Sequence, residues 1–321
     1  MDRLLGFLAR RAVLSILLVL FAVFTVLQPS IFLSEQNVAN VARQVSFNGI
    51  IALGETVVLI SGGIDISVGA VLSMAAALTM KLQPLGVGVA IGAALLFGLA
   101  VGVINGLLVT RIGIPPFIAT LGSMTVVQGL MLTYTQQQPI PGHIAWFTVF
   151  GAGSLGPLPV PALFLTAIAI FCSWWLNHTR SGRNIFAVGG NPDAARLAGI
   201  DLDLYRFLPY VFSGFCAALS GVLLASLLNT STIHIGLDTP LAVLAAAIMG
   251  GASLLGGRGS VAGTILGVLA LGMLSNGMDL LGVFTYYQIA IRAVILIAVV
   301  VIDSFYTSRL QDRTRRQAHA A

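Results

Sequence analysis

The chain has 321 residues, of which 57% are hydrophobic and only 8% are charged. Soluble domains carry roughly 25% charged residues, so this sequence has too few polar side chains to cover a water-soluble surface. A formal net charge of +5 would suggest a nucleic-acid partner for a soluble protein. Here the arginines cluster at the ends of apolar segments, as in membrane proteins, and we expect no nucleic-acid partner.

Apolar segments follow one another along nearly the whole chain, each close to the roughly 20 residues that a helix needs to cross the bilayer. Helices satisfy their own backbone in lipid, and these segments lack the alternation of barrel strands. We therefore predict an all-α integral membrane protein, a bundle of about ten transmembrane helices. The predicted spans are 12–33, 46–61, 64–81, 85–109, 113–134, 161–178, 207–228, 239–257, 260–280 and 284–303. They form a single domain over 1–321, embedded from 12 to 303, with a polar cytoplasmic tail at 304–321.

The first span resembles a signal peptide, because arginines precede a long apolar run. No A-x-A cleavage signal follows, and the run is long enough to cross the membrane, so we interpret it as an uncleaved first helix. With a cytoplasmic N-terminus, ten crossings place the C-terminus in the cytoplasm too. Thirteen of the 16 basic residues then lie inside, as the positive-inside rule requires: Arg3, Arg10, Arg11, Arg111, Arg180, Arg183, Arg196, Arg206, Arg258, Arg309, Arg313, Arg315 and Arg316.

The number of crossings is less constrained than the orientation. Segments 46–61 and 64–81 are short, and two re-entrant segments there would leave eight crossings with the same distribution of arginines. Residues 135–160, rich in glutamine and proline, are predicted to form an outer loop with at most a short helix.

Glu55 lies in the middle of an apolar segment, where a charged residue is costly and marks a site or a buried contact. It either lines a substrate route or is a hydrogen-bonded glutamate between helices. Asp65 and Ser67 follow two glycines that break the helix. We favour Asp65 as a cap of the next helix at the cytoplasmic edge over direct substrate contact.

Asn105 shares a helix face with Gly98 and Gly102, a spacing that lets helices approach closely. We therefore favour a packing role for this amide. Gly259, Gly263 and Gly267 repeat the spacing, and Asn276 follows near the outer end of that span. The candidate residues that line or buttress a substrate pathway are Glu55, Asp65, Ser67, Asn105 and Asn276.

A short helix is predicted inside the cytoplasmic loop 179–206. Asn191 is a natural N-cap, Pro192 fits the first turn, Asp193 suits the positive end of the dipole, and Gly199 suits the C-terminus. A helix of about two turns needs a partner surface to be stable, so we predict a docking role. The segment consists of Asn191, Pro192, Asp193, Ala194, Ala195, Arg196, Leu197, Ala198 and Gly199.

Sequence patterns of enzymes are absent. The only lysine, Lys81, follows Met80 and so cannot belong to a P-loop, and there is no H-E-x-x-H, C-x-x-C or G-x-S-x-G pattern. Cys172 and Cys216 both fall in apolar segments, where a small packing role is expected. We predict no catalytic residue, no metal site and no cofactor.

Five blocks in order resemble permease subunits of the ribose-type family of bacterial ABC sugar importers, and the resemblance covers roughly residues 45–303. The blocks are Ser61–Gly69 (SGGIDISVG), Val103–Thr110 (VINGLLVT), Ile114–Gly122 (IPPFIATLG), Ala187–Ile200 (AVGGNPDAARLAGI) and Gly250–Thr264 (GGASLLGGRGSVAGT).

The resemblance implies a type II permease fold, like that of the vitamin B12 importer, in the bacterial inner membrane. It also implies a second permease subunit, identical or homologous, cytoplasmic ATP-binding subunits and a periplasmic sugar-binding protein. The family's ATPase-coupling helix would fall at Pro192–Ala198, in agreement with the docking helix. In the family pattern the position of Glu55 is usually methionine or another uncharged residue, which implies a different cargo or pairing with a non-identical permease.

We therefore hypothesise a non-enzymatic transport subunit for a pentose or hexose, driven by ATP hydrolysis in a partner. One alternative is a secondary transporter driven by protons or sodium, with Glu55 as the coupling site. Another is a permease of the same family for an amino acid or a nucleoside. A membrane-embedded enzyme is disfavoured, because no acid, base and metal constellation is present.

Overall fold

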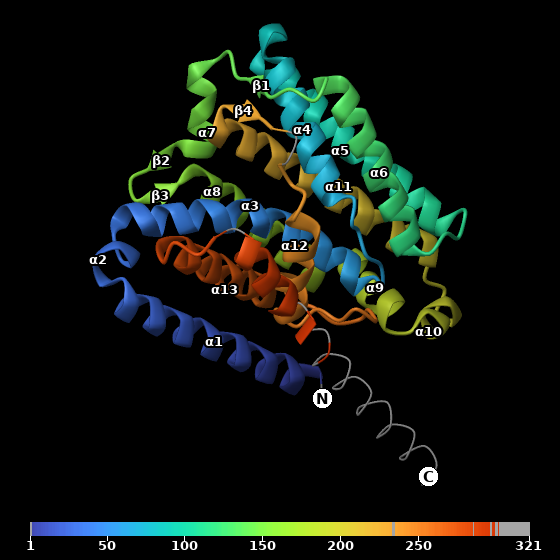
Figure 1. The fold of residues 1–321 in the computed structure, drawn as a ribbon. Helices are drawn as coiled ribbons and strands as arrows, with labels where there is room; N and C mark the ends of the chain where they lie inside the picture. The colour runs from blue at the N-terminus through green and yellow to red at the C-terminus, as the bar shows by residue number, and fades with distance from the viewer. Residues whose placement is uncertain (1, 233–234, 285, 296, 299–300, 302–321) are drawn as a thin grey trace.

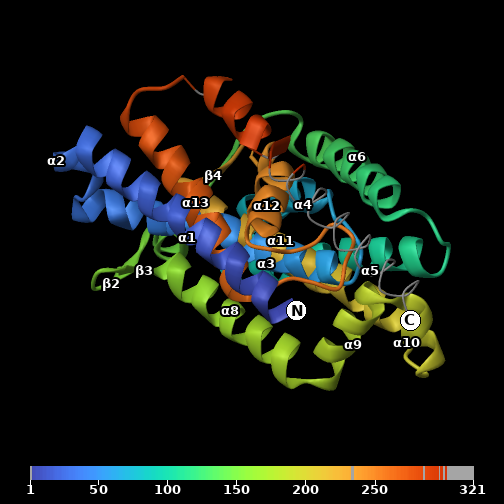
Figure 2. The same ribbon diagram turned by 90° about the horizontal axis from the view of Figure 1, so that it is seen from below.

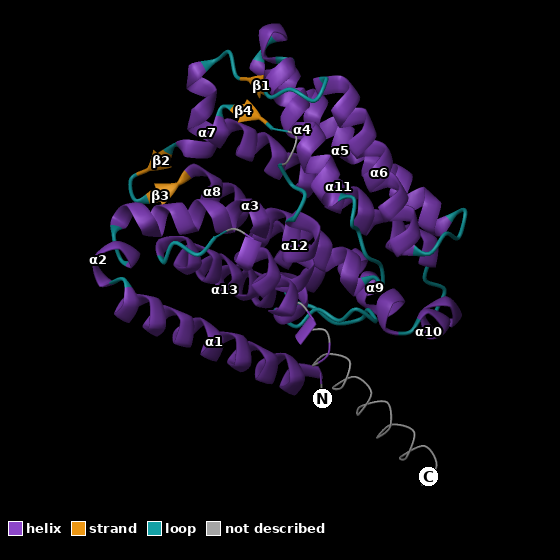
Figure 3. Ribbon diagram, in the orientation of Figure 1, coloured by secondary structure: helices purple, strands orange, loops and turns teal. Residues whose placement is uncertain are grey.

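The computed structural model describes the backbone of residues 2–232, 235–284, 286–295, 297–298 and 301, and the side chains of these residues from Val13 onward. They form a helical bundle with short strands at one end (Figures 1 and 3). The α-helices are α1 Asp2–Leu27, α2 Pro29–Phe32, α3 Glu35–Ile60, α4 Val68–Lys81, α5 Val87–Thr110, α6 Pro116–Thr135, α7 Val149–Ala152, α8 Val160–His178, α9 Arg180–Gly190, α10 Pro192–Leu197, α11 Leu202–Leu228, α12 Thr239–Met249 and α13 Val261–Leu280. Single 3₁₀ turns occur at η1 Gln83–Leu85 and η2 Ala145–Thr148, and residues 286–295 are also helical.

The bundle has two ends. At the strand end, β1 (Ile140–Pro141) pairs antiparallel with β4 (Thr230–Ser231), and β2 (Ser154–Leu155) pairs with β3 (Leu158–Pro159). At the α10 end lie α9, α10 and the start of α1, as both views show (Figures 1 and 2). The predicted loop 135–160 is thus a set of short strands and single turns, and the chain start and the docking helix share one end as predicted.

Five helices in the described part of the chain are long and apolar enough to cross a membrane: α5, α6, α8, α11 and α13. They agree with predicted spans 85–109, 113–134, 161–178, 207–228 and 260–280, with boundaries shifted by at most five residues. The first span corresponds to α1, which is apolar over Val13–Leu27. In the last span, residues 286–295 are helical; the end of that span and the predicted tail 304–321 lie outside the described residues.

Three predicted spans differ in length from the helices that occupy them. Segment 46–61 is the second half of α3, whose 26 residues rise about 39 Å and exceed the ~30 Å hydrocarbon core. Segments 64–81 and 239–257 contain only α4, with 14 residues, and α12, with 11 residues. These two rise about 21 and 17 Å, too little to cross the core alone.

The central helix is α11, which packs against α3, α4 and α5. Gly98 and Gly102 of α5 lie against the backbone of Gly214 and Tyr210 of α11, so a Cβ atom has no room at either glycine. The predicted small-residue face of α5 is confirmed. The same holds in α13, where Gly267 lies against the backbone of Ala246 in α12 and Gly263 against that of Gly250 just after it.

Candidate functional site

The chain breaks inside the bundle between α3 and α4. Gly62 has a φ of +84°, and the N–H of Gly63 donates to the carbonyl of Val58 at 3.0 Å, which together end α3. A Cβ atom on Gly63 would collide with the hydroxyl of Tyr210, so any larger residue would require this buried tyrosine to move. Asp65 is buried between helices, and the break lies beside Gly189 of α9, toward the α10 end of the bundle.

Asp65 holds this break in place through three hydrogen bonds. Its Oδ1 accepts from the backbone N–H of Ser67 at 3.0 Å and from the Ser67 hydroxyl at 2.6 Å. Its Oδ2 accepts from the hydroxyl of Ser213 on α11 at 2.8 Å. The predicted capping role is thus partly met: Asp65 binds an N–H just before α4, as in an Asx-turn, while the N-cap residue of the helix is Ser67.

Glu55 and Asn105 complete the group. Glu55 Oε1 accepts from the backbone N–H of Asp65 at 3.2 Å, and the side-chain amide of Asn105 donates to the Ser67 hydroxyl at 2.8 Å. All of these side chains are buried. We call them the α3–α4 cluster: Glu55, Asp65, Ser67, Asn105 and Ser213. It ties α3, α4, α5 and α11 together, and it contains four of the five residues that the sequence suggested.

Hydrogen bonding in the α3–α4 cluster is incomplete. In the described part of the chain, each partner of the two carboxyl groups is a backbone N–H or a hydroxyl. Among the residues that the structure describes, Glu55 Oε2 and Asn105 Oδ1 are buried without a hydrogen-bond partner. Unsatisfied polar atoms in a dry interior are costly, so this part of the core is less firmly held than its burial suggests.

Asn276 lies elsewhere. Its amide exchanges two hydrogen bonds with the amide of Asn37, at 3.0 and 2.8 Å, and Asn37 also donates to the carbonyl of Phe32 at 2.9 Å. Asn37 precedes Glu55 by 18 residues on α3, which is about 27 Å along the helix. Asn276 therefore joins α13 to the start of α3 and does not reach the α3–α4 cluster.

A small cavity of about 70 Å³ opens one turn beyond the α3–α4 cluster. Its walls come from the first turns of α4, the middle of α6 and the segment that leads into α12. The lining residues are Gly69, Ala70, Ser73, Met124, Gln128, Met131, Gly236, Leu237 and Pro240. Sequence reasoning missed this cavity, although Gln128, a lone amide between apolar neighbours, was a usable signal.

The predicted docking helix is present as α10. Asn191 caps it by accepting from the N–H of Ala194 at 3.0 Å, and Gly199 follows its end with a φ of +76°. Ala195 is buried in a small core that holds the helix against α9 and α11. Leu197 is 91% exposed, so α10 presents an apolar side chain that the described part of the chain leaves uncovered.

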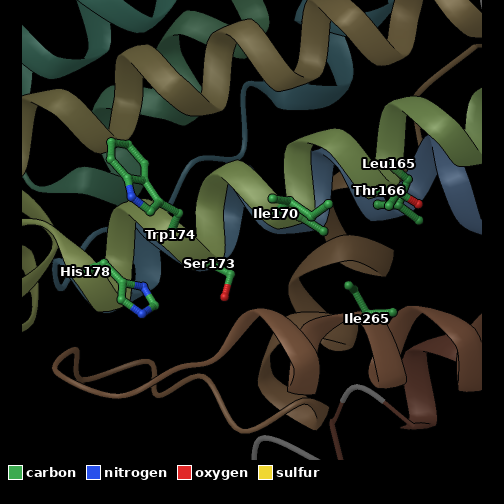
Figure 4. A pocket seen from close by; sticks show the side chains of 8 residues that line it. Leu165, Thr166, Ile170, Ser173, Trp174, His178 and Ile265 are labelled. Atoms are coloured by element: carbon green, nitrogen blue, oxygen red, sulfur yellow. The ribbon is translucent and has the colours of Figure 1, made fainter.

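A second cavity, a groove of about 510 Å³, lies between α8 and α13 (Figure 4). It opens on the outer surface of the bundle, away from the α3–α4 cluster, and was not expected from the sequence.

Comparisons of the sequence with known proteins identify its family. A family model described as branched-chain amino acid transport system / permease component matches residues 37–300. The ribose import permease of Bacillus subtilis (strain 168) is 41% identical over 294 residues, with 89% of this chain and 90% of the relative covered. The D-allose transport system permease of Escherichia coli (strain K12) is 35% identical, with 90% and 89% covered. The galactose/methyl galactoside import permease of the same strain is 33% identical, with 95% and 97% covered. Since the matches extend over most of the sequence, the chain belongs to this family of transport-system permeases.

Proposed function

We propose that this chain is the membrane permease subunit of an ATP-driven importer and that its cargo is a monosaccharide of the pentose or hexose class. Family membership supports the permease role. The names of three relatives, which concern ribose, D-allose and galactose, support the sugar. ATP hydrolysis takes place in a separate cytoplasmic subunit, a second permease subunit completes the pathway, and a periplasmic binding protein delivers the sugar.

The observation that carries this proposal is α10. It is a capped helix of six residues, too short to be stable alone, and it presents the exposed Leu197 beyond the ends of the long helices. Fully burying a leucine side chain is worth about 1.5–3 kcal/mol, so a partner that covers it gains a firm contact. The ATP-binding subunit is that partner, and α10 transmits its motion to α9 and α11.

The proposed topology follows from the arginines. The α10 end is cytoplasmic, ten segments cross the inner membrane, and the fold is of the vitamin B12 importer type. The start of α1 lies at the α10 end (Figure 1), which supports a cytoplasmic N-terminus. The short α4 and α12 count as crossings together with the non-helical segments beside them, because such backbone is tolerated at membrane depth where protein surrounds it.

The proposed pathway passes the cavity between α4, α6 and α12. Paired short or interrupted helices often border a transport site. Here Gln128 offers an amide to a sugar, and Ser73 Oγ, which donates to the carbonyls of Gly69 and Ile235, offers an acceptor. The α3–α4 cluster buttresses the start of α4 from behind. Asn276, through Asn37, buttresses the strand end.

Uptake by vesicles that contain the complete complex tests the proposal. We expect labelled ribose or a related sugar to accumulate with ATP inside, to persist when the proton and sodium gradients are collapsed, and to be absent with the permease alone. Collapse of uptake with the ion gradients while ATP persists would favour the secondary transporter with Glu55 as its coupling site. Competition by leucine or a nucleoside but by no sugar would reassign the cargo.

A further inference from the structure

The α8–α13 groove runs along the outer surface of the bundle. Figure 4 shows Trp174 and His178 at one end of it and Leu165 and Thr166 at the other, with Ile265 of α13 across from them. Apart from Thr166, Ser173 and His178 the lining is apolar. The side chains of Ile170 and Trp174 are exposed, so the groove opens sideways, toward the lipid in a membrane.

The length of the groove matches one lipid chain. From Leu165 to His178 the helix rises about 20 Å, and half of the ~30 Å hydrocarbon core is about 15 Å. One acyl chain of a single leaflet therefore fits along α8. The volume of about 510 Å³ is sufficient for such a chain.

The basic side chains at one end of the groove favour lipids with a particular headgroup charge. His178 ends α8, and Arg180 and Arg183 follow in the first turns of α9, with all three side chains exposed. Residues 160–190 contain no aspartate or glutamate. Basic sites between membrane helices attract anionic headgroups, and a tryptophan near the mouth is typical of the boundary between lipid and water.

We infer that the α8–α13 groove binds one anionic phospholipid, with an acyl chain along α8 and its phosphate at His178, Arg180 and Arg183. The charges favour an anionic over a zwitterionic headgroup, because only the former gains from the excess of positive charge. The inference does not depend on the cargo or on the energy source.

Native mass spectrometry of the purified complex, titrated with phosphatidylglycerol or phosphatidylcholine, tests the inference. The double variant Arg180→Ala/Arg183→Ala should weaken phosphatidylglycerol binding roughly 30-fold, on the basis of the usual contribution of an arginine near a lipid surface, with phosphatidylcholine unaffected. Ser173→Trp, which fills the groove, should remove one tightly bound lipid per chain.

Two control variants lie outside the groove: Arg111→Ala, at the end of α5, and Leu18→Trp, a 68% exposed position on α1. Both should keep the lipid. Equal phosphatidylglycerol binding by the wild type and the arginine double variant would overturn the inference. So would separation of the subunits by Ser173→Trp, since the groove would then be an interface between proteins.

Discussion

Two of the buried polar contacts between helices in the described part of the chain differ in completeness, and we call them joints. At the strand end, Asn37 and Asn276 exchange two amide hydrogen bonds, and neither carries a charge. At the α3–α4 break, the cluster contains two carboxyl groups, and Glu55 Oε2 and Asn105 Oδ1 have no hydrogen-bond partner among the described residues. Both joints are buried to a similar degree, so the difference lies in how well their hydrogen bonds are satisfied.

This difference in hydrogen bonding indicates which joint is suited to move. A complete neutral pair gains nothing by rearrangement, whereas an incomplete network has a low cost of adopting other partners. The complete pair joins α13 to α3 at one end, and the incomplete cluster supports the start of α4 beside the proposed pathway. We therefore expect the amide pair to be static and the α3–α4 cluster to change partners during transport.

The largest expected effect comes from Asp65→Ala. The substitution leaves two hydroxyls and one backbone N–H buried without their acceptor, and we expect the free energy of unfolding in detergent to fall by about 3 kcal/mol. Asp203→Ala, an exposed position on α11, should change it by less than about 0.5 kcal/mol. Equal effects of the two substitutions in urea titrations would refute the structural role of Asp65.

Asn276→Ala breaks the complete joint. It leaves the Asn37 oxygen unpaired, so the free energy of unfolding should fall by about 2 kcal/mol, while sugar uptake per folded complex stays at the wild-type level. Asn177→Ala, exposed on α8, is the matched control. A selective loss of uptake without a loss of stability would place Asn276 in the pathway.

Ser213→Ala and Ser220→Ala compare a carboxyl acceptor with a backbone carbonyl acceptor, each bound by a serine of α11. Ser213→Ala removes the donor to Asp65 Oδ2 and should cost about 1.5 kcal/mol, whereas Ser220→Ala, which removes a donor to the carbonyl of Phe47, should cost about 1 kcal/mol. Thermal unfolding of both variants shows which substitution costs more stability. The reverse order would mean that Asp65 is held mainly by Ser67.

The smallest change in stability is expected for Glu55→Gln. The amide keeps an oxygen that accepts from the Asp65 N–H. It also adds an N–H group that can donate a hydrogen bond to an unpaired buried oxygen, so stability should rise by up to about 1 kcal/mol. ATP-driven uptake should persist. Destabilisation as large as that of Ser213→Ala would show that Glu55 Oε2 already has a partner, and loss of uptake at normal stability would favour ion coupling.

Local signals in the sequence were sufficient to predict some of these structural features. The cap, the proline and the terminal glycine of α10 are neighbours in the chain, so Asn191, Pro192 and Gly199 predict the helix directly. Gly98 and Gly102 predict that α5 packs closely against another helix, because spacing by four residues defines a helix face, but they do not identify α11 as that helix. Most long helices were also found, since apolar length is itself the signal.

The missed features depend on contacts between distant segments. The hydrogen bond from Ser213 to Asp65 joins residues 148 positions apart, and a serine in an apolar span gives no warning of it. The first half of α3 was missed because Asn37 and Arg43 interrupt the apolar pattern, although neighbouring segments bury or bind both side chains. The short length of α12 is an exception, because its end has a local signal: Gly250 and Gly251 follow Met249, and Gly251 has a φ of +94°.

The most direct test of the account is ATP-driven sugar uptake by complexes that carry Leu197→Asp. Leu155→Asp, at the strand end and 66% exposed, is the matched control. If α10 receives the motion of the ATP-binding subunit, Leu197→Asp should lower the affinity for that subunit roughly 30-fold, as expected for loss of one well-buried apolar anchor, and uptake should fall in parallel. The control should transport like the wild type. Undiminished uptake and ATPase binding with Leu197→Asp would contradict the account.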